Sequence, residues 1–167
     1  MTLTSGGRAN GRQVRHRVCA RVLPVNPAGE VLLLHGWDPA APEAPYWFSI
    51  GGAADGEESL VDAAVREMRE ETGIVIRPAE LSEPIAREDA EFDWGIWRLV
   101  QDQTYFALAF AADHTEISFD GLEPIERTSI DAAAWWAPEA LEADGSAANE
   151  RLPEIMRLAV RAVRGSQ

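Results

Sequence analysis

The 167-residue chain contains no lysine, because all fifteen of its basic residues are arginine. This absence excludes Schiff-base mechanisms and the lysine of a phosphate-binding loop. The single cysteine, Cys19, cannot form an intramolecular disulfide, so a reducing cytoplasm is the expected location. No run of 18 or more apolar residues is present, and we therefore expect no membrane span.

Acidic residues outnumber basic ones. The 28 aspartates and glutamates, against fifteen arginines, give a formal net charge of −13. Such a field repels a polyanionic backbone, so the sequence predicts no binding of polymeric nucleic acid. A small phosphorylated substrate stays compatible with this charge if metal ions lie between the two negative partners.

The length and the hydrophobic content of 46% are typical of one globular domain with a core of its own. Residues 1–12 (MTLTSGGRANGR) lack the apolar run of a signal peptide, and we expect a flexible leader there. The prediction is a single domain over residues 13–167.

Hydrophobic patterning predicts strands mixed with at least two helices. Expected strands are 14–22 and 31–34, forming a hairpin about a turn at 26–29, then 46–50, 74–76, a pair at 96–100 and 104–110 around a turn at 101–103, and 130–136 as a strand or turn. Prolines at positions 39, 42 and 45 predict a loop over 38–45. Helices are expected over 59–72 and 153–163. The fold class is α/β (α+β), with layers of helix and sheet.

The helix expected over 59–72 carries its acidic residues on an unusual face. Ser59 with Asp62 three residues later is a capping-box pattern, and Gly73 is a natural stop. On a helical wheel with about 100° per residue, Glu67 and Glu71 fall inside the apolar arc. Glu70 lies at the edge of that arc, although a solvated face is available opposite.

This placement opposes folding unless a cation compensates it. Like charges four residues apart repel, carboxylates in the last turns face the negative end of the helix dipole, and burial removes their hydration. One arginine, Arg66, lies four residues before Glu70 and cannot neutralise three carboxylates. Hard divalent cations, which prefer oxygen ligands, can do so. The alternative is an exposed, highly charged helix end in a very acidic protein.

The segment from Gly52, GAADGEESLVDAAVREMREETGI, resembles the Nudix box, Gly-x5-Glu-x7-Arg-Glu-U-x-Glu-Glu-x-Gly-U, in which U is a bulky aliphatic residue. All nine specified positions are filled, by Gly52, Glu58, Arg66, Glu67, Met68, Glu70, Glu71, Gly73 and Ile74. Two neighbouring positions differ from many relatives, with Ile50 where proline is frequent and Glu57 where glycine is frequent. Neither supplies metal-binding chemistry, so they bear on loop shape and substrate choice.

The resemblance implies the Nudix fold, a mixed β-sheet between helices, and hydrolysis of a nucleoside diphosphate linked to another group with Mg²⁺ or Mn²⁺. By position, Glu67, Glu70 and Glu71 would hold the metal, and the carbonyl of Gly52 would add a ligand. Arg66 would orient these carboxylates, and Glu58 would support the site from the preceding loop. The resemblance is also compatible with a homodimer.

Many relatives use a further glutamate outside the box, and Glu126 is the best-matched candidate, with Glu123 as the alternative. Either of them could equally be an exposed loop charge. In the hypothesis for the mechanism, divalent ions neutralise the diphosphate, Glu67 or Glu126 takes the proton of a water, and the water attacks phosphorus. A ligand-binding or regulatory domain without turnover is the alternative function, and the intact box argues against it.

The sequence says less about the substrate. Arg15, Arg17 and Arg21 share one face of a predicted strand, either contacting phosphates or pointing into solvent. Trp94 and Trp97 could stack on a base or ring, but for each of them core packing is the stronger interpretation.

Overall fold

The computed structural model describes residues 4–9, 11–111 and 116–165. Its strands are β1 (Thr4–Ala9), β2 (Arg12–Val25), β3 (Val31–Asp38), β4 (Ala41–Phe48), β5 (Ile50–Ala53), β6 (Leu81–Trp94), β7 (Trp97–Ala109) and β8 (Ile130–Trp136). Its helices are α1 (Leu60–Thr72), the 3₁₀ turn η1 (Pro78–Glu80), α2 (Pro124–Arg127), α3 (Pro138–Asp144) and α4 (Leu152–Gly165). No helix in these ranges has the length and apolar character needed to cross a membrane.

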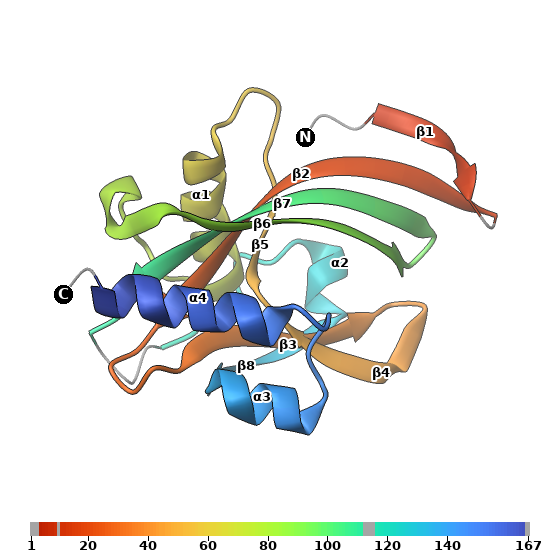
Figure 1. The fold of residues 1–167 in the computed structure, drawn as a ribbon. Coiled ribbons are helices and arrows are strands. Elements are labelled where there is room, and N and C mark those ends of the chain that lie inside the picture. Colours follow the sequence, from red (N-terminus) through yellow and green to blue (C-terminus); the bar gives the residue numbers. More distant parts are fainter. Residues whose placement is uncertain (1–3, 10, 112–115, 166–167) are drawn as a thin grey trace.

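The described strands join one mixed sheet, whose main path is β4-β3-β2-β7-β6 (Figure 1). Off this path, β1 and β5 pair with β2, and β8 pairs with β3. The central pair, β2 and β7, is parallel over thirteen partners from Gln13 with Trp97 to Val25 with Ala109. The neighbouring β6–β7 pair is antiparallel, and β5 pairs antiparallel with β2 from the other side. The long parallel pairing therefore brings the first third of the chain beside residues about 84 positions further on.

Side chains of the central strands alternate between two cores, because successive residues of a strand point to opposite faces. Leu32 and Leu34 pack with Met68 of α1 on one face. Leu33 packs with Met156 of α4 on the other. Figure 1 shows α1 and α4 on opposite sides of the strands. The predicted arrangement, a mixed sheet between helices, is confirmed.

Several predicted elements are also confirmed, and some extend further than expected. The strand expected over 14–22 lies in β2, and the C-terminal helix is α4. Of the two alternatives for 130–136, a strand or a turn, the structure has the strand, β8. The turn at Asn26 closes with the amide of Gly29 donating to the Asn26 carbonyl at 3.0 Å. However, β2 and β3 pair only at Val25 and Val31, so most of β2 bonds to β5 and β7 rather than to its hairpin neighbour.

The prediction of paired strands around 101–103 is wrong. Gln101 and Gln103 lie inside one continuous strand, β7, and the turn is at Gly95, which adopts φ 59°. Strand β6, which precedes this turn, is absent from the prediction. Its charged residues alternate with less polar ones because one face is solvated, and this pattern is weaker than the continuous apolar run of a buried strand.

Four further differences concern one expected loop, two expected strands and the expected leader. The loop expected over 38–45 is largely strand β4, whose prolines are tolerated because β4 lies at the sheet edge, where it pairs with β3 and forms one further bridge, from Trp47 to Ala147. The strand expected over 46–50 divides at Ser49 between β4 and β5, and 74–76 has no regular structure. Within the expected leader, Thr4–Ala9 forms β1 and pairs with β2, since backbone pairing does not require apolar side chains.

Candidate functional site

Helix α1 places the acidic residues, and its two ends are fixed by the predicted caps. The Ser59 hydroxyl accepts a hydrogen bond from the amide of Asp62 at 3.1 Å. Gly73 ends the helix in the left-handed region at φ 76°, and its amide donates to the Arg69 carbonyl. The caps set where α1 begins and ends, and its apolar face, which includes Ala64 and Met68, packs into the core against the sheet.

The inward orientation of Glu67 and Glu71 is confirmed, because they are only 9% and 2% exposed. One oxygen of Glu71 accepts a hydrogen bond from the amide of Gly51 at 2.9 Å. Glu67 packs against Gly52 so closely that a Cβ there would lie 2.6 Å from a carboxylate oxygen. The paired glycines of β5 therefore leave room for two carboxylates against the backbone.

Arg66 forms hydrogen bonds with several carboxylates of the acidic cluster. Its guanidinium donates two hydrogen bonds to Glu58, at 3.0 and 2.9 Å, in a bidentate pair. The Nη1 group also donates to Glu67 and Glu70, each at 3.1 Å, and Nη2 donates to the Ala53 carbonyl at 3.0 Å. Arg66 thus joins the loop before α1, the helix itself and the end of β5, and this fixes the orientation of Glu67 and Glu70.

The electrostatics of the cluster show an excess of buried negative charge. Burial, with repulsion from Glu70 and Glu126 and partial relief from Arg66, raises the pKa of Glu67 to about 7. Burial and repulsion from Glu67 also raise the pKa of Glu71 well above its usual range. In contrast, the hydrogen bonds from Arg66 lower the pKa of Glu58, so this loop carboxylate is ionised and forms a stable pair.

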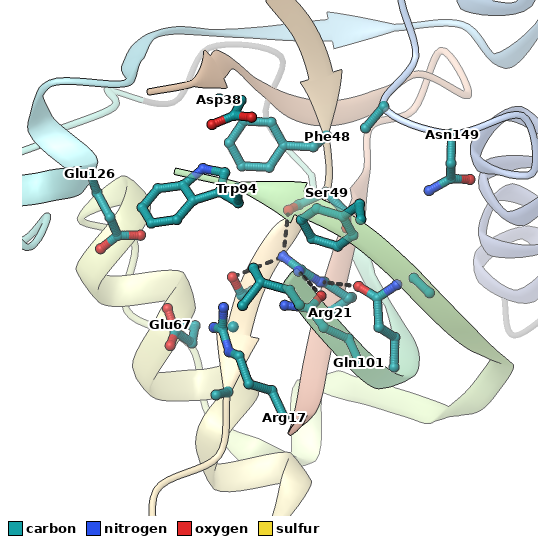
Figure 2. A pocket seen from close by; sticks show the side chains of 18 of the residues that line it. Arg17, Arg21, Asp38, Phe48, Ser49, Glu67, Trp94, Gln101, Glu126 and Asn149 are labelled. Atoms are coloured by element: carbon teal, nitrogen blue, oxygen red, sulfur yellow. Dashed lines mark hydrogen bonds between the residues drawn. The ribbon is translucent and has the colours of Figure 1, made fainter. Parts of the chain in front are cut away.

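Glu126 approaches the cluster from α2, whereas Glu123 is exposed. Figure 2 shows the Glu126 carboxylate on the same side of the cavity as Glu67. Burial raises the pKa of Glu126, and its charge contributes to the raised pKa values of Glu67 and Glu71. Both glutamates line the cavity, but it is the charge of Glu126 that acts on Glu67 and Glu71.

The donor set fits a hard divalent cation in its chemistry. Within the described part of the chain, no three acidic, histidine or cysteine side chains already converge with the spacing of metal ligands. Glu67 and Glu70 are instead held by Arg66, and Glu71 is held by the Gly51 amide. Because the cluster is buried and its carboxylates outnumber the arginine, a cation that shares their oxygens would relieve the repulsion.

A cavity of about 840 Å³ opens beside the cluster and is larger than a diphosphate alone requires. Arg15, Arg17 and Arg21 all line it, together with Trp94 and Trp97. The Arg15 guanidinium lies 3.1 Å from the centre of the Trp97 ring, a cation–π contact. The arginine face of β2 therefore points into the cavity rather than only into solvent.

Arg21 is half-buried, and its guanidinium forms several hydrogen bonds with the protein. It donates to the amide oxygens of Gln103 and Gln101 at 2.8 and 3.2 Å, and to the carbonyls of Ser49 and Gly51 (Figure 2). The two glutamines were not predicted as cavity residues. The available signal was their alternation at positions 101 and 103 between apolar residues, which indicates one polar face of a strand.

Comparison with known proteins supports the family resemblance that the Nudix box indicates. The family model of the NUDIX domain matches residues 15–158. The chain belongs to the Nudix family. It is 35% identical over 140 residues to the RNA pyrophosphohydrolase of Novosphingobium aromaticivorans, an alignment that covers 75% of this chain and 80% of that protein. The chain is thus a Nudix pyrophosphohydrolase, an enzyme acting on phosphorus-containing anhydrides.

Solved structures of Nudix proteins share the fold at low sequence identity. A MutT protein from Methanosarcina mazei aligns with a TM-score of 0.63 at 18% identity, covering 91% of this chain and 96% of that one. The Ap4A hydrolase of C. elegans gives 0.58 at 20% identity, covering 89% and 98%. The E. coli dihydroneopterin triphosphate pyrophosphohydrolase gives 0.60 at 21%, covering 86% and 94%. These likenesses concern the fold alone.

Proposed function

We propose that this Nudix enzyme hydrolyses the diphosphate linkage of a nucleoside diphosphate joined to another group, with Mg²⁺ or Mn²⁺ as cofactor. The observation that carries the proposal is the pair of buried carboxylates, Glu67 and Glu71, on the wall of a cavity that is also lined by the three arginines of one face of β2. Carboxylates on one side and arginines on the other match a substrate whose phosphates lie between metal ions and guanidinium groups.

Glu67, Glu70, Glu71 and the carbonyl of Gly52 would hold the metal. When bound, divalent ions neutralise phosphate charge, polarise phosphorus and lower the pKa of water. The raised pKa values of Glu67 and Glu71 support this assignment, because the fold keeps their charges close together without enough protein cations.

The remaining residues position groups and move a proton. Arg66 holds Glu67 and Glu70 in place, and Glu58 in turn holds Arg66 through its bidentate pair. Glu126 or Glu67 accepts the proton of the attacking water, since both carboxylates have pKa values raised toward neutrality. Water attacks one phosphorus in line, the bridging P–O bond of the diphosphate breaks, and the other phosphate leaves with the bridging oxygen. Positioning with electrostatic stabilisation supplies most of the catalysis.

The substrate favoured by the charge of the chain is a small nucleotide or nucleotide sugar, because the net charge of −13 opposes a polymeric anion. The second candidate is RNA, and the observation favouring it is the 35% identity with an RNA pyrophosphohydrolase. A phosphoanhydride occurs in RNA only at the 5′ end, so the enzyme would then bind that end in the same cavity.

The experiment is an assay of purified protein with Mg²⁺ or Mn²⁺ against nucleotide sugars, dinucleoside polyphosphates, nucleoside triphosphates and a 5′-triphosphorylated oligonucleotide. We expect turnover of at least one class and incorporation of ¹⁸O from labelled water into a phosphate product. Glu70→Gln and Glu71→Gln should fold and lose turnover. Binding without hydrolysis across the panel would instead indicate the regulatory alternative.

We further infer a cytoplasmic location from the single buried cysteine. The family resemblance admits a homodimer, and light scattering on the purified chain would measure its mass in solution. A monomeric mass would contradict the dimer without affecting the assignment of the site.

A further inference from the structure

One buried carboxylate in the cavity lies outside the Nudix box. Glu88, on β6, is 8% exposed and lines the cavity. Within the described residues, its Oε2 atom is buried and accepts no hydrogen bond. Arg151 forms an ion pair with this atom through Nη1 at 3.5 Å, from a side chain that is 51% exposed. A buried carboxylate that is ion-paired with one half-exposed arginine but accepts no hydrogen bond at Oε2 keeps lone pairs for a donor in the cavity.

Hydrogen-bond donors lie on the neighbouring strand. Gln103 is the direct register partner of Glu88, and Gln101 lies two residues before it on the same face of β7. The amide oxygens of both glutamines accept from Arg21, at 2.8 and 3.2 Å. Because these bonds fix the orientation of each amide, both NH₂ groups are turned away from Arg21 and available as donors.

The position of Glu88 relative to the box follows from the sheet register. Ala53 of β5 pairs with Cys19 of β2, which pairs with Gln103 of β7, which pairs with Glu88. Three strand spacings therefore separate β5, against which the box carboxylates pack, from Glu88, or roughly 14 Å. A nucleotide whose diphosphate lies at the box can extend its base toward β6 over this distance.

Aromatic side chains form the opposite wall. Phe48 and Trp94 line the same cavity, and Figure 2 shows both rings across from Arg17 and Arg21. A flat ring can pack against these aromatic side chains while its edge reaches the polar side chains of Glu88 and Gln103. The cavity therefore combines a surface for stacking with an acceptor and a donor for one ring edge.

We propose that Glu88 and Gln103 form a specificity subsite for a ring that carries adjacent N–H donors beside a carbonyl, the 2-amino-4-oxo edge shared by guanine and pterins. The ring N–H and the exocyclic amine donate to the Glu88 carboxylate, and the ring carbonyl accepts from the Gln103 amide. Adenine lacks the amine at this position and directs a ring nitrogen lone pair at the carboxylate. The inference rests on the proposed function, in which the diphosphate of the same ligand lies at the box.

The test is calorimetric binding of guanosine, adenosine and neopterin to the full chain in EDTA, which needs neither metal nor turnover. The wild-type protein should bind guanosine about tenfold or more tightly than adenosine. Glu88→Gln should remove this preference, whereas Glu83→Gln, an exposed charge on the same strand outside the cavity, should keep it. Tight neopterin binding would extend the ligand class to pterins, and weak binding would restrict it to guanine.

Equal affinity for guanosine and adenosine in the wild-type protein, or a preference unchanged in Glu88→Gln, would overturn the subsite. If Glu88→Gln unfolds, Glu88→Asp retains the charge but retracts the carboxylate, and should still reduce the preference. The outcome is separable from the proposed function: selective nucleoside binding without hydrolysis of any phosphorylated compound contradicts only the activity, and hydrolysis with no base preference contradicts only the role of Glu88.

Discussion

Glu67→Gln should make the metal-free protein more stable while removing its activity. Burial and neighbouring charges raise the pKa of Glu67 from 4.5 to about 7 in the folded protein. The folded state therefore binds a proton more tightly than the unfolded state, so the stabilising contribution is present below pH 4.5 and is lost as the pH rises to about 7. Above that pH the ionised carboxylate lowers the free energy of unfolding by about 3 kcal/mol. This follows from a pKa difference of roughly 2.5 between the folded and unfolded states, at 1.36 kcal/mol for each pKa unit.

The glutamine variant has the same shape and lacks this cost. In EDTA at pH 8, we expect its melting temperature to exceed that of the wild type by ~6 to 12 °C, using 2–4 °C per kcal/mol for a chain of this size. At pH 5 the difference should fall to about 1 kcal/mol, because the folded wild type is then protonated. Excess Mn²⁺ at pH 8 should stabilise the wild type far more than the variant.

Scanning calorimetry with and without Mn²⁺ measures both effects. Glu57→Gln is the matched control, since Glu57 is exposed and its loss changes the net charge equally. If Glu67→Gln and Glu57→Gln melt at the same temperature in EDTA at pH 8, the buried charge does not oppose folding and the electrostatic reasoning is refuted.

Three further predictions concern the groups around Glu67. Arg66→Lys loses the bidentate pair with Glu58 and should lower kcat by about 10- to 100-fold with the fold retained, which circular dichroism and steady-state kinetics would check; unchanged kcat would contradict the positioning role. Gly52→Ala places a Cβ 2.6 Å from a Glu67 oxygen and should weaken Mn²⁺ binding in a titration, whereas wild-type affinity would show that Glu67 can move aside at no cost. If Glu126 is the base, Glu126→Gln should lower kcat about 100-fold and Glu123→Gln should not, and equal effects of the two changes would argue against Glu126.

The box and its helix are the part of this structure that the sequence predicts best. The helix period alone places Glu67 and Glu71 against the core, and caps at Ser59 and Gly73 set the helix ends. These features are local, since they depend on residues within one or two turns of each other. The same locality explains why the turn at Asn26 was predicted.

The far side of the cavity depends on contacts between distant segments. Gln101 and Gln103 were interpreted as a turn because polar residues interrupt an apolar run. Their burial is made favourable by hydrogen bonds from Arg21, about 80 positions earlier. Likewise, Glu88 lies on a strand whose pairing with β7 is not encoded in its own pattern. Sequence periodicity reports which residues share a face, but not which face meets another.

The most direct measurement is a titration of Mn²⁺ into the purified protein at pH 8, followed by the loss of the free-ion electron paramagnetic resonance signal. The inward-facing carboxylates predict saturable binding in the wild type, weakened at least about tenfold in Glu71→Gln and unaffected in Glu57→Gln. Binding that does not saturate, or that is equal in all three proteins, would contradict the claim that cations neutralise this cluster.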